Sequence, residues 1–181
     1  SQGTYAIALG AFSGEYRQSS SAIAIGSAAG STSQGNSAVA IGPSSGQINQ
    51  GNAAIAAGTN AGNTSQGEYA IAMGSTAGQN QQGTKAVAMG SRTGQYQQGV
   101  NAVAIGNQAG NTSQGSYAIA IGNLAGQTSQ HTNSIILNAG STALNSGTAG
   151  AFYVGSVRNV TQANLLAYDT TLKEITYFSL S

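Results

Sequence analysis

The amino-acid sequence predicts an all-β protein, a parallel β-solenoid of the β-roll type, and three observations support this prediction. A 16-residue unit repeats without insertion, so that residues 22–26, Ala-Ile-Ala-Ile-Gly, have a counterpart in each unit. Within each unit large and small apolar residues alternate, as in a strand with two different faces. Glycines recur at fixed positions, and a fixed short period is the signature of coils that stack on one another.

The first element of each coil is a short strand. Its copies lie at residues 6–9, 22–25, 38–41, 54–57, 70–73, 86–89, 102–105 and 118–121, with a ninth, weaker copy at 134–138. Because successive side chains of a strand point to opposite sides, the large residues share one face and the alanines the other. We expect the large residues, such as Ile71 and Ile119, to line the interior. We expect the flat alanine row, with Ala72 and Ala104, to lie against another chain.

Two glycines per coil mark the corners, as Gly26 and Gly30 do in the second coil. Glycine tolerates positive φ and close backbone contact, which corners require. A helix is disfavoured, because each interior glycine would cost about 1 kcal/mol relative to alanine. Nine coils at roughly 4.8 Å each make a rod about 43 Å long.

A glutamine occupies the same position in all nine coils. The predicted structural ladder consists of Gln34, Gln50, Gln66, Gln82, Gln98 and Gln114, with Gln2, Gln18 and Gln130 at its ends. Stacked amides can hydrogen-bond along the rod, as in cross-β structures. We predict a coil-to-coil ladder at a corner or a subunit seam, and the alternative is an exposed stripe that binds a ligand.

The core of one coil is small, and this predicts association. Burial of one large apolar side chain contributes about 1.5–3 kcal/mol, whereas ordering costs on the order of 1.5 kcal/mol per residue. Each coil offers about two large apolar residues and several alanines. The sequence therefore predicts a partner chain, most simply in a homotrimer of parallel rods.

Two segments resemble a known family. Residues 36–42, Asn-Ser-Ala-Val-Ala-Ile-Gly, and residues 101–106, Asn-Ala-Val-Ala-Ile-Gly, are similar to the head repeats of YadA-like trimeric autotransporter adhesins. The resemblance covers roughly residues 1–138. It implies a left-handed parallel β-roll, three chains per head and adhesion to a surface.

The chain divides into a β-solenoid, residues 1–138, and a C-terminal β cap or trimer foot, residues 139–181. Residues 164–168 and 174–178 read as the two strands of a hairpin. Aromatic residues gather here, and a bulky cap would cover the strand edges at the end of a solenoid. A receptor-binding tip is the alternative. The segments 151–159 and 165–177 also resemble those that follow β-rolls in fibre proteins of phages and large DNA viruses.

Composition argues against several classes of function. Only 5% of the residues are charged, and the five cations are scattered, which disfavours nucleic-acid binding. No apolar run approaches the roughly 20 residues of a membrane helix, so we expect no membrane insertion. Cysteine is absent, which excludes disulfides and thiolate metal sites. We expect neither a metal nor a cofactor.

The residues for catalysis are few, and we predict that the chain is not an enzyme. His131 is the only histidine, and Glu15, Glu68, Asp169 and Glu174 are the only acids. Glu15 and Glu68 occupy different repeat positions, so they do not form the carboxylate pair of a glycosidase. No serine lies in a nucleophile elbow.

The sequence therefore predicts a structural segment of an extracellular or virion (tail or capsid) fibre that supports attachment to a host or surface. The alternative is a bacterial trimeric autotransporter adhesin head that binds matrix or glycan directly. Its candidate contacts are Tyr69, Tyr96, Tyr117 and Arg92. Either reading places the chain outside the cell, on a virion or cell surface, with its own copies and a host glycan or protein as partners.

Two further patterns carry less weight. An ice-binding solenoid needs flat threonine ladders, and Ile48, Asn80 and Tyr96 interrupt the one that is present. N-glycosylation sequons begin at Asn63, Asn111 and Asn159, and chance is the favoured account for them.

Overall fold

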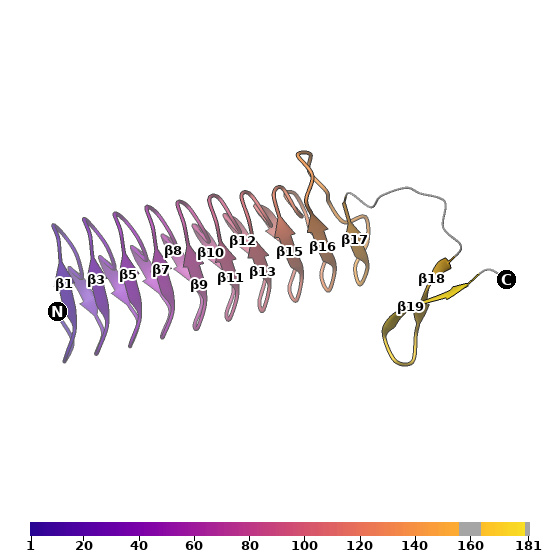
Figure 1. Ribbon diagram of the computed structural model, residues 1–181. Helices are drawn as coiled ribbons and strands as arrows, with labels where there is room; N and C mark the ends of the chain where they lie inside the picture. Colours follow the sequence, from indigo (N-terminus) through magenta and orange to yellow (C-terminus); the bar gives the residue numbers. More distant parts are fainter. Residues whose placement is uncertain (156–163, 180–181) are drawn as a thin grey trace.

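The computed structural model describes residues 1–155 and 164–179. Figure 1 shows an extended rod of stacked coils, followed by a two-stranded hairpin. The described residues form strands and turns and no helix. The coils contain about 16 residues each and their strands are parallel, which confirms the predicted all-β parallel β-solenoid.

Each of the first seven coils contributes one strand to each of two parallel sheets, and the later coils contribute strands to the first sheet only. We call the first the isoleucine sheet; it consists of β1 (Ile7–Leu9), β3 (Ile23–Ile25), β5 (Val39–Ile41), β7 (Ile55–Ala57), β9 (Ile71–Met73), β11 (Val87–Met89), β13 (Val103–Ile105), β15 (Ile119–Gly122), β16 (Ile135–Asn138) and β17 (Phe152–Val154). The second, the glutamine sheet, consists of β2 (Tyr16–Gln18), β4 (Thr32–Gln34), β6 (Ile48–Gln50), β8 (Thr64–Gln66), β10 (Asn80–Gln82), β12 (Tyr96–Gln98) and β14 (Thr112–Gln114).

Equivalent residues of successive coils stack on one another in both sheets. In the isoleucine sheet Ala72 pairs with Ala88 and Met73 with Met89, and in the glutamine sheet Gln66 pairs with Gln82. The register is the 16-residue period itself, so each repeat position forms a column along the rod.

The alanines, and not the large apolar residues, fill the interior. Ala72 and Ala104 have no exposed surface, whereas Met73 is 41% exposed. The expectation that the large row lies inside and the alanine row faces another chain is therefore wrong. The reason is space: a Cβ added to Gly78 would lie 3.2 Å from the Cβ of Ala72, so a larger side chain has no room at the alanine position.

The interior widens at the C-terminal end of the rod. In β16, Ile136 stands opposite Ala120 and is fully buried, with Leu144 and Tyr153 packed against the same cluster. The next strand, β17, continues the isoleucine sheet beyond residue 138. Ile136 is the one large apolar side chain among the buried residues of the described chain, and it lies where the 16-residue spacing ends.

A hairpin follows the rod. Strands β18 (Asn164–Asp169) and β19 (Glu174–Ser179) are antiparallel, and Tyr168 pairs with Ile175. In the turn, Asp169 Oδ1 accepts hydrogen bonds from the backbone N–H groups of Thr171 at 2.7 Å and Leu172 at 2.9 Å. These two bonds stabilise the carboxylate and lower the pKa of Asp169.

Candidate interaction surfaces

The outer face of the isoleucine sheet carries two columns of large apolar side chains, which we call the apolar stripe. Its first column is Ile7, Ile23, Val39, Ile55, Ile71, Val87, Val103, Ile119, Ile135 and Phe152. Its second column is Leu9, Ile25, Ile41, Ala57, Met73, Met89, Ile105, Ile121, Leu137 and Val154. The strands of this sheet contain no charged residue.

The stripe is exposed over the whole rod. Ile41 is 44% exposed near one end and Leu137 is 37% exposed near the other. Ten strands span about 43 Å and a three-residue strand about 10 Å, which gives a patch of roughly 430 Å² in projection. Patches of this size are as large as the largest on a typical monomer and often mark an interaction site.

The repeated glutamines lie inside the coils, and Gln82 illustrates their bonding. Its Nε2 donates to the carbonyl oxygen of Ile71 at 2.7 Å and to that of Ala86 at 3.3 Å. The bond to a residue 11 positions earlier recurs in all eight glutamines from Gln18 to Gln130, at 2.7–2.9 Å. The seven glutamines from Gln18 to Gln114 therefore tie the glutamine sheet to the isoleucine sheet across the interior, and Gln130 makes the same bond in the next coil.

Bonds between the stacked amides are fewer. Gln98 donates to Gln114 Oε1 and Gln114 donates to Gln130 Oε1, each at 3.1 Å. Gln82 Oε1 and five equivalent atoms have no hydrogen-bond partner within the described part of the chain. With 1–2% of their surface exposed, the glutamines from Gln18 to Gln130 do not form an exposed ligand-binding stripe.

Each buried glutamine requires the glycine four residues before it. Gly78 has a φ of +51°, in the left-handed region, and a Cβ at this position would lie 2.7 Å from Gln82 Oε1. Any other residue would displace the amide as well as strain the backbone. The spacing Gly-x-x-x-Gln is therefore one structural unit.

A second amide column lies beside the glutamine strands, and the sequence analysis missed it. Asn63 Nδ2 donates to Gln47 Oε1 at 2.9 Å, Gln95 Nε2 to Gln79 Oε1 at 2.8 Å, and Asn111 Nδ2 to Gln95 Oε1 at 3.1 Å. We call this column the outer amide ladder. The sequence pattern that indicates this ladder is an Asn or Gln three residues before the buried glutamine. This pattern recurs in six successive coils.

The outer amide ladder bears on two of the sequons. Asn63 Nδ2 also donates to the carbonyl oxygen of Ser44 at 2.9 Å, and Asn111 Nδ2 to that of Arg92 at 2.7 Å. Both amide hydrogens are thus engaged, and a glycan on either nitrogen would replace one of these bonds. The third sequon, at Asn159, lies outside the described residues.

The structure does not bring the four candidate contact residues together. Tyr69 and Tyr117 are 57% and 59% exposed at equivalent turns, three coils and so about 14 Å apart. Tyr96 lies in β12, where its Oη accepts a hydrogen bond from Gln95 Nε2 at 3.1 Å. Arg92 lies at a corner. Their role as contacts stays a prediction.

The titratable residues do not assemble a catalytic centre. His131 Nδ1 lies 2.9 Å from Ser146 Oγ, which also accepts a hydrogen bond from the backbone N–H of His131. Glu15 raises the pKa of the neighbouring Tyr16 through a hydrogen bond and its negative charge. In residues 1–155 and 164–179 no three His, Cys, Asp or Glu side chains gather to hold a metal ion. No helix of that part is long and apolar enough to cross a membrane.

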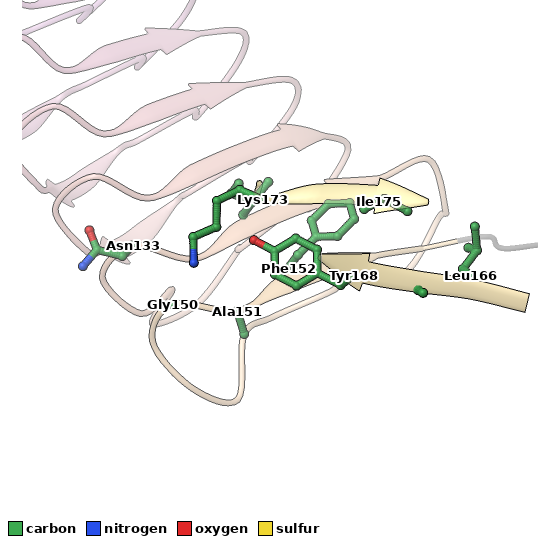
Figure 2. A pocket seen from close by; sticks show the side chains of 10 residues that line it. Asn133, Gly150, Ala151, Phe152, Leu166, Tyr168, Lys173 and Ile175 are labelled. Atoms are coloured by element: carbon green, nitrogen blue, oxygen red, sulfur yellow. The ribbon is translucent and has the colours of Figure 1, made fainter. Parts of the chain in front are cut away.

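An open hollow of about 770 Å³ lies between the end of the rod and the hairpin. Ile135 and Phe152 of the apolar stripe line one side, and Leu166, Tyr168 and Ile175 of the hairpin line the other. Figure 2 shows the rings of Tyr168 and Phe152 lying near one another beside Ile175. Lys173 is the one charged residue of the lining.

Comparison with family models, curated proteins and solved structures finds no match. The fold therefore defines the class by itself: the chain is a β-solenoid repeat protein with an apolar and a polar outer face.

Proposed function

We propose that this chain is a non-enzymatic structural segment of an extracellular or virion fibre that assembles with its own copies and supports attachment to a host or surface. The observation that carries the proposal is the apolar stripe, which runs the full length of the rod. A solenoid that kept its apolar side chains for its own core would not expose them in every coil.

A second copy of the chain is the partner that fits the stripe best. Its side chains recur at the same spacing of about 4.8 Å, so ridges and gaps of two rods can interdigitate over many coils. A partner without this period would match only a few coils. Because the stripe carries no charge, no repulsion opposes the contact of identical faces.

A homotrimer of parallel rods uses both columns of the stripe. In a three-fold bundle each chain has two neighbours, and a stripe that faces the three-fold axis brings equivalent residues of the three chains close to one another. The glutamine sheet then forms the outer surface of the fibre. In this arrangement the hairpin at the C-terminal end serves as a cap or foot.

The second candidate is an adhesin head that binds matrix or glycan directly, and the outer face of the glutamine sheet favours it. Hydroxyl and amide side chains dominate there, and Arg17 is the only charged residue in these strands. Such side chains can donate to and accept from sugar hydroxyls. Tyr96 adds an aromatic face in β12.

Removal of one coil separates the two candidates. Deletion of residues 66–81 keeps the period, and the rod should shorten by about 4.8 Å and still assemble. Attachment by a fibre tip should survive this deletion. Loss of binding in a well-folded, shortened assembly would favour the adhesin head instead.

A matched pair of charges tests the contact face. Ile41→Asp places a charge in the stripe, and Thr32→Asp places one on the glutamine sheet of a neighbouring coil. We expect the first to reduce the mass measured by analytical ultracentrifugation to that of one chain, and the second to leave the assembly intact. Equal behaviour of the two variants would contradict this assignment of the interface.

A further inference from the structure

The apolar stripe matches a second copy in more than one register. Its columns repeat every 16 residues, so a shift of one coil places Met73 where Met89 was and a similar side chain at nearly every other level. Such a shift keeps nine of the ten strand levels in contact. The stripe by itself therefore holds the copies together without fixing their alignment, and alignment needs a feature that does not repeat.

The hairpin is a non-repeating feature on the same face. Leu166 and Tyr168 alternate along β18, and Ile175 pairs with Tyr168, so the three side chains share one face of the hairpin. They are 79%, 57% and 58% exposed. Two-stranded hairpins are at best marginally stable alone, so this face needs a partner.

The apolar face of the hairpin lies across the hollow from the end of the apolar stripe. Ile135 and Phe152, the last residues of the first column, line it together with the hairpin side chains. The contact within one chain is incomplete, because Phe152 remains 50% exposed. The volume of about 770 Å³ is large enough for several apolar side chains. The lining is continuous with the stripe that we assign to self-association.

We propose that the apolar face of each hairpin packs into the hollow of a neighbouring copy, against the same segment of that copy, and thereby fixes the register between parallel chains. The inference rests on the proposed fibre function. A chain displaced by one coil would keep most of its stripe contacts but would carry its hairpin about 4.8 Å away from its neighbour's hollow. Each shifted register therefore loses the contact of the hairpin, whereas the repeats alone would make the registers nearly equal in energy.

Cysteine cross-linking measures the register directly, because the natural chain contains no cysteine. Met89→Cys and Ile105→Cys lie at one repeat position, one coil apart. Co-assembled in the full chain, these variants should give 89–89 and 105–105 cross-links when the chains are in register. They should give mixed 89–105 cross-links when the chains are shifted by one coil. Mass spectrometry of the linked peptides distinguishes the products.

We expect matched cross-links almost exclusively with the natural hairpin. Ile175→Asp, and Leu166→Asp as a second variant on the same face, should raise the ratio of mixed to matched cross-links towards one. Thr176 lies on the opposite face of the hairpin, so the control variant Thr176→Asp should leave the ratio of mixed to matched cross-links low.

The outcomes separate the two proposals. Chains that stay monomeric give no cross-links and overturn the proposed function together with this inference. Chains that associate, but show mixed cross-links with the natural hairpin or an unchanged ratio in both Asp variants, overturn the register role alone.

Discussion

The isoleucine sheet and the glutamine sheet have the same period and the same register, yet they differ in the side chains that they turn inward and outward. The inward side chain is alanine in the isoleucine sheet from β3 to β15, and it is glutamine in the glutamine sheet. Outside, one sheet exposes large apolar residues and the other hydroxyls and amides. The difference shows that size governs the inside of this solenoid and polarity the outside. The inward side chains hold the coil closed, and the outward ones determine what the rod contacts.

Neighbouring alanines on opposite sides of β7 give the sharpest contrast. Ala56 is fully buried, whereas Ala57 is half-buried in the apolar stripe between Ile41 and Met73. Ala56→Leu should destabilise the fold by about 3 kcal/mol or more, because the coil has no room for it. Ala57→Leu should be tolerated and should strengthen association by filling a gap in the stripe. Chemical denaturation of both variants checks this, and equal losses would mean that the two faces are not distinct.

Loss of a buried glutamine amide should have the next largest effect on stability. Gln82→Ala removes two hydrogen bonds to carbonyl groups and leaves a cavity, and we expect a loss of about 2–4 kcal/mol. Gln81→Ala, one residue earlier on the exposed side of β10, should stay within about 0.5 kcal/mol. Thermal unfolding followed by circular dichroism compares the pair. A small effect of the first substitution would show that the buried amides contribute little to holding the two sheets together.

Acid should affect the hairpin before it affects the rod. The pKa of Asp169 is lowered in the folded turn by the N–H groups of Leu172 and Thr171. Its contribution is therefore present above the unfolded pKa and is lost as the pH falls through the lower, folded pKa. The buried residues of the described rod include no titratable side chain. The amide chemical shifts of Thr171 and Leu172 should change in acid while those of β9 and β11 do not, and Asp169→Asn should remove the change at these two amides.

Much of the rod could be predicted, because the repeat itself carries the information. The period set the parallel register, and Gly78 and its equivalents marked the corners. Alternation showed two faces but not which one lies inside, and the large residues were placed there because apolar burial usually decides. The thickness of the coil decides which face lies inside. The glycine four residues before each buried glutamine, such as Gly78 before Gln82, indicates how little room the coil has.

Other features left a weaker signal. The glutamine strands were not predicted, because residues such as Thr32, Asn80 and Tyr96 share a column without sharing hydrophobicity. The outer amide ladder was missed because Asn63 and Gln79 differ in length and resemble a variable loop. The hollow near Phe152 depends on how the hairpin meets the rod, which no local pattern encodes.

The mass of the natural chain in solution tests the central claim most directly. The claim is that the apolar stripe is a surface for copies of the same chain, most simply three. Light scattering on the intact chain at micromolar concentration should give three times the chain mass of 17.8 kDa. A folded, stable particle of 17.8 kDa under the same conditions would contradict the account.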